Sequence, residues 1–440
     1  MTPSARLAAS IDLLAAMEAA PRKPADAVAN SFFRERRYIG GGDRRAISGL
    51  VWDVMRGWRR LSWWLQKQNL PVSARLLCGA RLVLDGMAVS AVANLYAEGR
   101  YATGVLERHE WDGFIAMQDK PLDSPDMPRA VRLELPDWLL PRLEETFGPA
   151  LETEVKALSG EAPLDLRVNT LLADRAEARK ALAREGLHAE PTPHSPWGLR
   201  LEGRLPVTAS VPFRDGRVEI QDEGSQLVAA MTAAGPEMRV LDYCAGAGGK
   251  TLAMAMMMNN RGHIVACDVS EPRLDGAVRR LRRAGVHNVE RHLLGVTGDK
   301  WAKRRAASFD RVLVDAPCSG TGTWRRNPDA RFRTTETDLA ELLVKQAAIM
   351  DRASALVRPG GRMIYATCSL LKAENADQVH AFLARHPDFR LVPSEAPDLP
   401  ESLRHESMIS LTPARDETDG FFGAVMERVP TQDEASTSQA

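Results

Sequence analysis

The sequence has little cysteine and no long apolar run, and these absences exclude several classes of protein. Only five cysteines occur among 440 residues. Their odd number and the lack of a Cys-x-x-Cys pair argue against a disulfide framework or a zinc site, so no metal is expected. No apolar run approaches the ~18 residues that a membrane helix needs, so no membrane partner is expected. The amphipathic start, which contains Asp12, is not typical of a secretory leader, and the expected compartment is the cytoplasm.

Net charge is absent as well. The 58 Lys and Arg residues balance 58 Asp and Glu residues, so the formal net charge is zero. Binding to nucleic acid would therefore depend on local basic patches rather than on overall charge. A hydrophobic content of 44% and a charged content of 26% are typical of a globular protein. A chain of 440 residues is expected to form two or three domains.

A glycine-rich segment, residues 240–251, predicts a strand, a turn and a helix over residues 252–258. Two common glycine motifs do not fit this turn. A P-loop needs glycine where Cys244 stands, and the dinucleotide fingerprint needs glycine where Thr251 stands. The remaining interpretations are an S-adenosylmethionine turn and an ordinary glycine turn of another α/β enzyme.

The spacing of acidic and glycine residues favours S-adenosylmethionine. Asp242 is followed by Gly246 and Gly248, which would let the backbone approach the cofactor at a helix N-terminus. Asp268 ends the next apolar run, where a carboxylate can bind a ribose diol. The residues predicted to bind this cofactor are Cys244, Ala245, Gly246, Ala247, Gly248, Gly249, Lys250, Asp268 and Asp315.

Two cysteine segments each follow a short apolar run that predicts a buried parallel strand. Residues 315–322 contain Cys318, and residues 365–369 contain Cys368. Because ligands bind outside the carboxyl ends of such strands, both thiols should face one crevice. A lone buried cysteine is usually an inert apolar residue, but two at strand ends favour covalent chemistry.

These segments resemble the RNA (cytosine-5) methyltransferases of the Nop2/Sun family, and specifically their ribosomal RNA small-subunit methyltransferase B branch. The amino-terminal third separates the branches, because residues 42–56 resemble a helical domain related to the antitermination factor NusB. Shorter matches occur at residues 167–169, 221–226, 325–329, 374–375 and 419–422.

The resemblance implies a doubly wound, Rossmann-like α/β core preceded by an all-α NusB-like domain and a small α+β, RNA-recognition-like subdomain. A proline-rich linker at residues 121–128 and strand–helix alternation from Val218 agree with this division. The expected parts are a helical RNA-binding domain (1–128), linker helices with the small subdomain (129–215), the methyltransferase domain (216–429) and a disordered tail (430–440).

The resemblance also implies a reaction, the transfer of a methyl group from S-adenosylmethionine to C5 of a cytidine in 16S ribosomal RNA. Cys368 would form a bond to C6 of the base, Cys318 would assist release, and Asp315 would hydrogen-bond to N3 and the exocyclic amine. DNA cytosine methyltransferases suggest the opposite assignment, with Cys318 as nucleophile. The implied partner is small-subunit ribosomal RNA rather than DNA, for a monomeric protein. Alternatives are the same chemistry on transfer RNA, and an RNA-binding ribosome-assembly factor with vestigial activity.

Arginines cluster with tryptophans in the helical region, and two interpretations stay open there. The cluster is either an RNA-binding face or a set of core tryptophans with solvated arginines. The residues are Arg34, Arg36, Arg37, Arg44, Arg45, Arg56, Arg59, Arg60, Trp52, Trp58, Trp63 and Trp64. A second arginine run, at residues 279–283, predicts a solvated helix face, whereas Lys250 is expected either beside a thiol or in solvent.

One departure from the family concerns the adenine pocket. The family places an acidic residue after the third strand, but Leu294 stands near that position here. Asp299 is a candidate replacement, five residues later.

Overall fold

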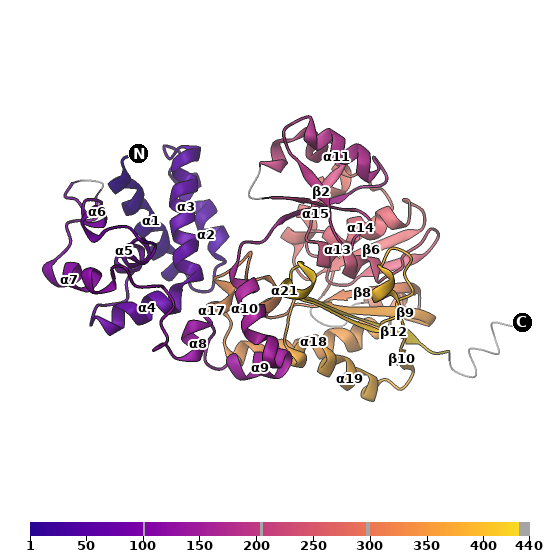
Figure 1. Ribbon diagram of the computed structural model, residues 1–440. Helices are drawn as coiled ribbons and strands as arrows, with labels where there is room; N and C mark the ends of the chain where they lie inside the picture. The colour runs from indigo at the N-terminus through magenta and orange to yellow at the C-terminus, as the bar shows by residue number, and fades with distance from the viewer. Residues whose placement is uncertain (100–101, 203–205, 296–299, 431–440) are drawn as a thin grey trace, which may run out of the picture. The chain divides into compact units, whose positions relative to one another are not determined.

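The computed structural model describes residues 1–99, 102–202, 206–295 and 300–430, so Asp299 and residues 431–440 of the expected tail lie outside the described residues. The chain divides into two compact units (Figure 1). The helical unit contains Met1–Gly160 and Trp324–Glu336. The catalytic unit, so named for the site below, contains Glu161–Thr323 and Thr337–Ala440. Among the described residues, no helix is both long and apolar enough to span a membrane.

Among its described residues, the helical unit contains helices and no strands. Its helices are α1 (Pro3–Glu18), α2 (Ala25–Glu35), α3 (Gly41–Arg56), α4 (Trp58–Lys67), α5 (Ala74–Leu84), α6 (Val89–Ala93), α7 (Arg108–Met117), α8 (Arg129–Arg132), α9 (Leu140–Phe147), α10 (Leu151–Ser159) and α17 (Ala330–Arg333), with a 3-10 turn, η1 (Gly148–Ala150). Apolar residues at helical spacing, such as Ile47, Val51 and Val54 on α3, are fully buried in one core.

The tryptophans of the helical region belong to this core. Trp64 is 5% exposed and donates its indole N–H to the carbonyl of Leu122 at 3.0 Å. Trp52, Trp58 and Trp63 are partly buried against the same core. The tryptophans therefore stabilise the helical packing, and they do not form an exposed stacking surface.

The arginines of the region divide into paired and exposed residues. Arg59 binds Asp137 at 3.1 Å, and Arg60 binds the buried carboxylate of Glu134 at 2.9 Å. These two guanidinium groups hold α4 against the segment that follows α8. The exposed arginines of the cluster are Arg34, Arg37 and Arg45.

Residues 324–336, which follow Cys318 closely in the chain, are built into the helical unit. The residue before α2 is Pro24, which cannot cap the helix with its side chain; instead Asp329 accepts a hydrogen bond from the amide of Ala25 at 3.0 Å. Arg331 is 3% exposed and lies over the ring of Trp324, 4.7 Å from its centroid. Burial lowers the pKa of Arg331 to about 10.

The catalytic unit contains two sheets. The strands are β1 (Leu164–Val168), β2 (Ala189–Pro191), β3 (Gly198–Leu201), β4 (Val218–Ile220), β5 (Arg239–Asp242), β6 (His263–Asp268), β7 (Val289–Leu293), β8 (Phe309–Asp315), β9 (Val357–Thr367), β10 (Phe389–Leu391), β11 (Met408–Leu411) and β12 (Phe421–Arg428). The helices are α11 (Arg175–Ala183), α12 (Val211–Arg214), α13 (Glu223–Ala230), α14 (Gly249–Met257), α15 (Glu271–Arg283), α16 (Lys300–Arg304), α18 (Glu336–Ser354), α19 (Ala376–Arg385), α20 (Glu401–Arg404) and α21 (Pro413–Asp416), with 3-10 turns η2 (Val207–Ala209), η3 (Thr321–Thr323) and η4 (Lys372–Glu374).

The larger sheet has the strand order β10-β12-β9-β8-β5-β6-β7, and β11 pairs with β12. Strands β5 to β9 pair in parallel, whereas β12 is antiparallel to its neighbours. From β5 the chain proceeds to β6 and β7 on one side, and later to β8 and β9 on the other. The order therefore reverses beside β5, which is where ligands bind in open α/β sheets.

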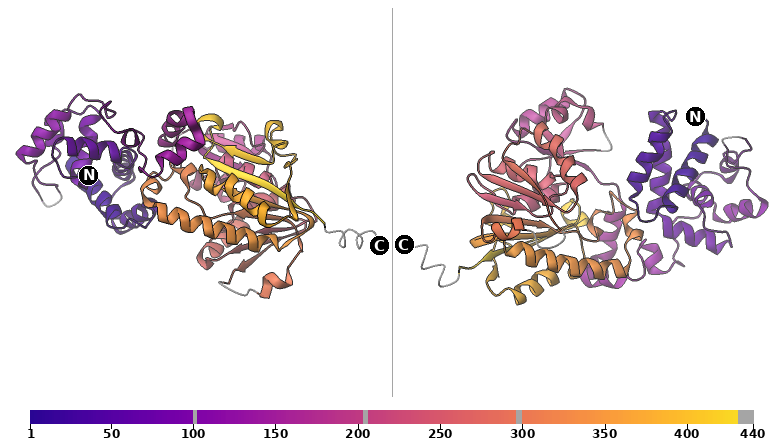
Figure 2. Two further views of the ribbon diagram at one scale, coloured as in Figure 1. Left: turned by 90° about the horizontal axis from the view of Figure 1, so that it is seen from below. Right: turned by 180° about the vertical axis from the view of Figure 1, so that it is seen from behind.

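Both faces of this sheet are covered by helices, as Figures 1 and 2 show. Alternate strand residues enter different cores because successive side chains of a strand point to opposite faces. Val240 packs with residues of α14 and α15, whereas its neighbour Leu241 packs with Met350 of α18 and Phe382 of α19. The expected doubly wound, Rossmann-like core is confirmed.

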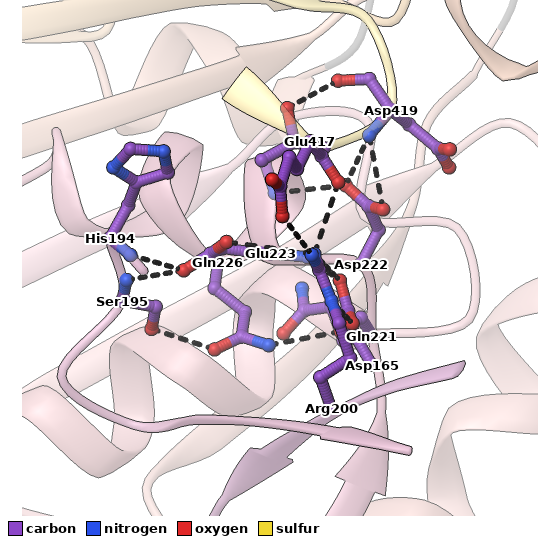
Figure 3. Close-up of polar contacts among 12 residues, drawn as sticks. Asp165, His194, Ser195, Arg200, Gln221, Asp222, Glu223, Gln226, Glu417 and Asp419 are labelled. Atoms are coloured by element: carbon purple, nitrogen blue, oxygen red, sulfur yellow. Dashed lines mark hydrogen bonds and ion pairs between the residues drawn. The ribbon is translucent and has the colours of Figure 1, made fainter. Parts of the chain in front are cut away.

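The smaller sheet is antiparallel, in the order β2-β3-β1-β4. A buried polar network joins it to the rest of the catalytic unit (Figure 3). Arg200 of β3 binds Asp165 of β1 through two hydrogen bonds, of 2.8 and 3.0 Å. Glu223, at the start of α13, is fully buried and accepts the amides of His194 and Ser195, both at 2.6 Å.

We expect Asp329→Ala to lower the free energy of unfolding by about 1–3 kcal/mol, because it leaves the amide of Ala25 without its buried acceptor. Urea unfolding of the full chain, followed by circular dichroism, measures this change. Asp26→Ala is the matched control, since Asp26 lies exposed in the first turn of the same helix. An equal loss in both variants would show that residue 329 does not cap α2.

Candidate active site

The glycine turn after β5 has the backbone conformation that its sequence predicts. Gly246 and Gly248 have φ values of 55° and 80°, in the left-handed region that favours glycine. A Cβ added at Gly248 would also lie 3.2 Å from Cβ of Ala277. The helix that follows begins at Gly249, three residues earlier than the expected start, so its first N–H groups lie directly at the turn.

Two arginines from distant segments hold this turn in place. Arg167 is 2% exposed and donates a hydrogen bond to the carbonyl of Gly249 at 2.8 Å and another to Gln221. Arg280 donates to the carbonyl of Ala247 at 2.7 Å and pairs with Glu219. The expectation that the run 279–283 is a solvated face is therefore wrong for Arg280, and also for Arg283, which pairs with Glu219 and lies over the ring of Phe213. In the sequence Arg167 stands only within a short family match, residues 167–169, and no pattern there predicts its contact with the turn.

Asp268 at the end of β6 faces the glycine turn. Its carboxylate accepts the amide of Gly246 at 2.9 Å and the amide of Ser270 at 2.8 Å. These two bonds fix the orientation of the carboxylate, which is 95% buried but borders the cavity described next.

A cavity of about 530 Å³ lies beyond the ends of β5, β6 and β8. Eight of the nine residues predicted to bind the cofactor line it, the exception being Gly248. Four residues of α18 also line it, namely Lys345, Ala348, Ile349 and Arg352, and no motif in the sequence predicts them. Leu294 lies on the cavity wall, so an apolar side chain lines the cavity near the position where the resemblance implies an acidic residue.

Asp242 also lines this cavity, and only one of its two carboxylate oxygens has a hydrogen-bond partner among the described residues. One oxygen, Oδ2, accepts a hydrogen bond from the hydroxyl of Thr251 at 2.6 Å, whereas Oδ1 is buried without a hydrogen-bond partner. Burial raises the pKa of Asp242 to about 7, and the charges of Asp315 and Asp268 add to this effect. A ligand that carries a positive charge would satisfy the oxygen and favour its ionised form. S-adenosylmethionine, with an ammonium and a sulfonium, has this property.

Lys250 and Asp315 form an ion pair of 2.7 Å at the same cavity. Burial alone would lower the pKa of Lys250, but the charge and hydrogen bond of Asp315 outweigh burial and raise it. The charge of Lys250 also interacts with Cys368. The solvent-exposed position considered for Lys250 is therefore wrong, since its side chain is only 11% exposed.

The two cysteines at the strand ends are in contact. β8 and β9 pair in parallel, with Asp315 opposite Ala366, and the sulfurs of Cys318 and Cys368 lie 3.4 Å apart. The hydrogen bond with Cys368, burial and the nearby charge of Glu374 all raise the pKa of the Cys318 thiol. Cys318 thus stays protonated beside Cys368. Two adjacent thiols, one of them near an ammonium, can carry out nucleophilic catalysis.

The fold and the site together define a Rossmann-like methyltransferase that depends on S-adenosylmethionine. A family model described as 16S rRNA methyltransferase RsmB/F matches residues 229–427, and one described as the ferredoxin-like domain of RsmF/B-like methyltransferases matches residues 135–208. The chain belongs to this RsmB/F family.

Similar proteins extend over most of the chain. A probable ribosomal RNA small subunit methyltransferase B of Synechocystis sp. is 32% identical over 411 residues, which cover 88% of this chain and 91% of the relative. The ribosomal RNA small subunit methyltransferase B of Salmonella newport is 30% identical, with the same coverage. A crystal structure of a methyltransferase homologue from Pyrococcus horikoshii is 27% identical, with a TM-score of 0.59, and covers 70% of this chain and 100% of that chain. The crystal structure of PH0851 covers 97% of this chain and 99% of that chain, with a TM-score of 0.77 and 25% identity, so the likeness includes the helical unit, consistent with the NusB-like expectation.

We expect the affinity for S-adenosylmethionine to increase as the pH rises toward about 7, the pKa of Asp242 in the free protein. Below that pH the carboxyl is protonated, and a cationic ligand must displace the proton, which costs about tenfold in affinity per pH unit. Calorimetry in buffers of different ionisation enthalpy should detect proton release on binding. Asp242→Asn, which keeps an acceptor for Thr251, should lose both effects. An unchanged pH dependence in this variant would contradict the assignment.

Proposed function

We propose that this protein transfers a methyl group from S-adenosylmethionine to C5 of a cytidine in 16S ribosomal RNA, through a covalent bond between Cys368 and C6 of the base. The observation that carries the proposal is the 3.4 Å contact between the two thiols. Cys318 lies three residues after Asp315, and Cys368 lies two residues after Ala366, the strand partner of Asp315. The relatives' names support the substrate class, and such a substrate would place the enzyme in the cytoplasm.

The chemistry requires a sulfur nucleophile because C5 of cytosine is too weak a nucleophile to attack a sulfonium methyl group directly. Addition of a thiolate to C6 converts C5 into the nucleophilic carbon of an enamine. Cys368 is the better placed thiol for this addition, since the ammonium of Lys250 has an electrostatic interaction with it. Cys318, whose pKa is raised, remains the neutral partner.

Asp315 orients the base in this proposal. Its carboxylate would accept a hydrogen bond from the exocyclic amine and another from N3 once N3 carries a proton, which draws electrons away from C6 and favours addition there. The ion pair with Lys250 fixes the carboxylate at the mouth of the cavity before substrate arrives. Pro317, which also lines the cavity, sets the backbone between Asp315 and Cys318.

Release requires transfer of the C5 proton to a base such as water, which re-forms the C5–C6 double bond while the bond between sulfur and C6 breaks and its electron pair returns to sulfur. Cys318 lies beside the sulfur that must leave, so it is placed to assist this elimination and not the addition. In the DNA-type assignment the roles are exchanged, with Cys318 as the nucleophile and Cys368 assisting release. The two assignments predict a stable adduct in different cysteine variants.

The cofactor would be held by the turn from Cys244 to Lys250 and by Asp268, with its methyl group supplied toward the cysteine side of the cavity. Asp268 would bind the ribose diol through the lone pairs that its two backbone bonds leave free. Leu294 and Val269, which is 70% exposed, would offer apolar contacts to the adenine ring. Adenine recognition would then depend less on a carboxylate than in the rest of the family.

Ribosomal RNA would bind in part to the exposed arginines of the helical unit. We expect the triple variant Arg34→Ala, Arg37→Ala and Arg45→Ala to bind RNA more weakly, with the slope of log affinity against log salt reduced by about 2, because each lost phosphate contact removes ~0.7. Filter binding across salt concentrations measures the slope. Arg108→Ala, which removes an arginine side chain that is 87% exposed elsewhere in the unit, is the control. An unchanged slope in the triple variant would exclude this surface.

The two cysteines should fail in different ways. Cys368→Ala removes the group that bonds to C6, so we expect neither methylated product nor covalent adduct. Cys318→Ala leaves addition and methyl transfer possible but slows elimination, so the protein should accumulate on methylated RNA as a slow band in a denaturing gel. An adduct with Cys368→Ala and none with Cys318→Ala would establish the opposite roles.

Mass spectrometry of ribosomal and transfer RNA nucleosides, from cells with and without the gene, identifies the substrate.

A further inference from the structure

One fully buried carboxylate connects the two cysteine loops. Glu374 is 0% exposed and ends the 3-10 turn η4 before α19. Its Oε1 accepts the amide of Ser319 at 2.8 Å and the side-chain amide of Gln346 at 2.9 Å. Its Oε2 accepts the hydroxyls of both Ser319 and Ser369.

Each of these serines directly follows one of the cysteines. Ser319 follows Cys318 in the chain, and Ser369 follows Cys368, so Glu374 binds the residue directly after each cysteine. The two hydroxyls themselves lie 3.2 Å apart. Two loops that are fifty residues apart in sequence are thereby joined through one carboxylate group.

Glu374 is itself held by the strand that leads to Cys368. The hydroxyl of Tyr365, on β9, donates to the carbonyl of Glu374 at 2.7 Å. The next residue, Asn375, donates to the carbonyl of Ser369 at 2.8 Å. The carboxylate is therefore fixed relative to β9 and presents its second oxygen to the loop after β8.

A buried carboxylate is costly unless hydrogen bonds stabilise it. The four donors to Glu374 are a backbone amide, a side-chain amide and two hydroxyls, all of them uncharged. A pair of apolar side chains could fill the same space at lower cost. Retaining the charge and its four donors is reasonable where the geometry of the attached loops matters.

We propose that Glu374 is a positioning residue that holds the sulfurs of Cys318 and Cys368 in contact, and so sets the geometry of adduct formation and release. The inference deepens the proposed function and rests on it for its catalytic meaning. Glu374 is fully buried, so it acts through Ser319 and Ser369 and not on the base or cofactor. Its negative charge has a second effect, because it contributes to the raised pKa of Cys318.

The distance between the sulfurs can be tested without RNA. Diamide oxidises two adjacent thiols to a disulfide and is itself reduced to the hydrazine, so the rate of linkage between Cys318 and Cys368 reports their proximity. We expect Glu374→Ala in the full chain to slow this linkage by on the order of tenfold or more, measured by mass spectrometry of the joined peptides. Asp377→Asn, which removes an exposed carboxylate three residues away, should link at the native rate.

The charge of Glu374 gives a readout that a merely structural role would not change. Glu374→Gln keeps the shape of the side chain and removes its charge, so alkylation of Cys318 by iodoacetamide should occur at lower pH than in the native protein. Asp377→Asn should leave the pH profile in place. Calorimetric binding of S-adenosylmethionine checks that each variant is folded, and Glu374→Gln decides the question if Glu374→Ala does not fold.

Two outcomes separate this inference from the proposed function. If neither Cys318→Ala nor Cys368→Ala forms an adduct although Glu374 is intact, the covalent mechanism fails, and the thiol measurements still decide the positioning role. If Cys318→Ala forms an adduct and the double variant Cys318→Ala, Glu374→Ala forms it equally fast, the positioning role alone fails. Native linkage rates and a native pH profile in folded Glu374 variants would also overturn it.

Discussion

The active-site geometry depends on the parallel pairing of β8 and β9. In this register Asp315 lies opposite Ala366, and each strand continues into a loop that carries a cysteine within three residues. A slip of one residue would turn every side chain of a strand to the other face and separate the two thiols. The pairing is buried on both faces, because Val314 and Tyr365 are fully buried in the core on one face, and Leu313 and Ile364 are fully buried in the core on the other. The core that stabilises the sheet therefore also specifies the register on which the cysteine contact depends.

Hydrogen bonds between the loops then fix the positions of the residues that follow the two strands. The amide of Gly322 donates to the carbonyl of Cys368 at 2.9 Å, and the amide of Ala316 donates to that of Ala366 at 2.8 Å. Gly322 also lies so close to Gly420 that a Cβ would come within 2.2 Å of its carbonyl oxygen. The loops thus form a rigid layer above the strand ends. Pre-organisation of this kind lowers the barrier of a reaction whose partners must meet at a fixed angle.

Local motifs in the sequence predicted the parts of the site that a single segment determines. The glycine turn, Asp268 and both cysteines follow from residue type and from position at a strand end, and the structure brings them to one region. The partners that hold them were not predictable in the same way. Arg280 looks like any arginine on a helix surface, and only the fold shows that it reaches the carbonyl of Ala247. Glu374 was visible as a family match, but its link to Ser319 spans 55 residues.

The helical unit illustrates the same limit on a larger scale. Periodicity predicts its helices, and the open choice for the tryptophans is resolved by packing, since they contribute to the core. No periodic signal indicates that Trp324–Glu336, which lies between the two cysteines in the sequence, belongs with helices of the first 160 residues. Its buried Arg331 and capping Asp329 require those helices as partners.

Because residues 324–336 pack in the helical unit, deletion of that unit cannot separate its role in RNA binding from catalysis. Deleting the first 128 residues would remove the partner of Asp329 and much of the surface that covers residues 324–336. That segment begins six residues after Cys318, so the deletion would disturb a loop that continues directly into the active site. A loss of activity in the truncated protein would then not distinguish RNA binding from damage to the catalytic loop. Substitution of exposed arginines, which leaves the core and the segment intact, isolates the electrostatic contribution.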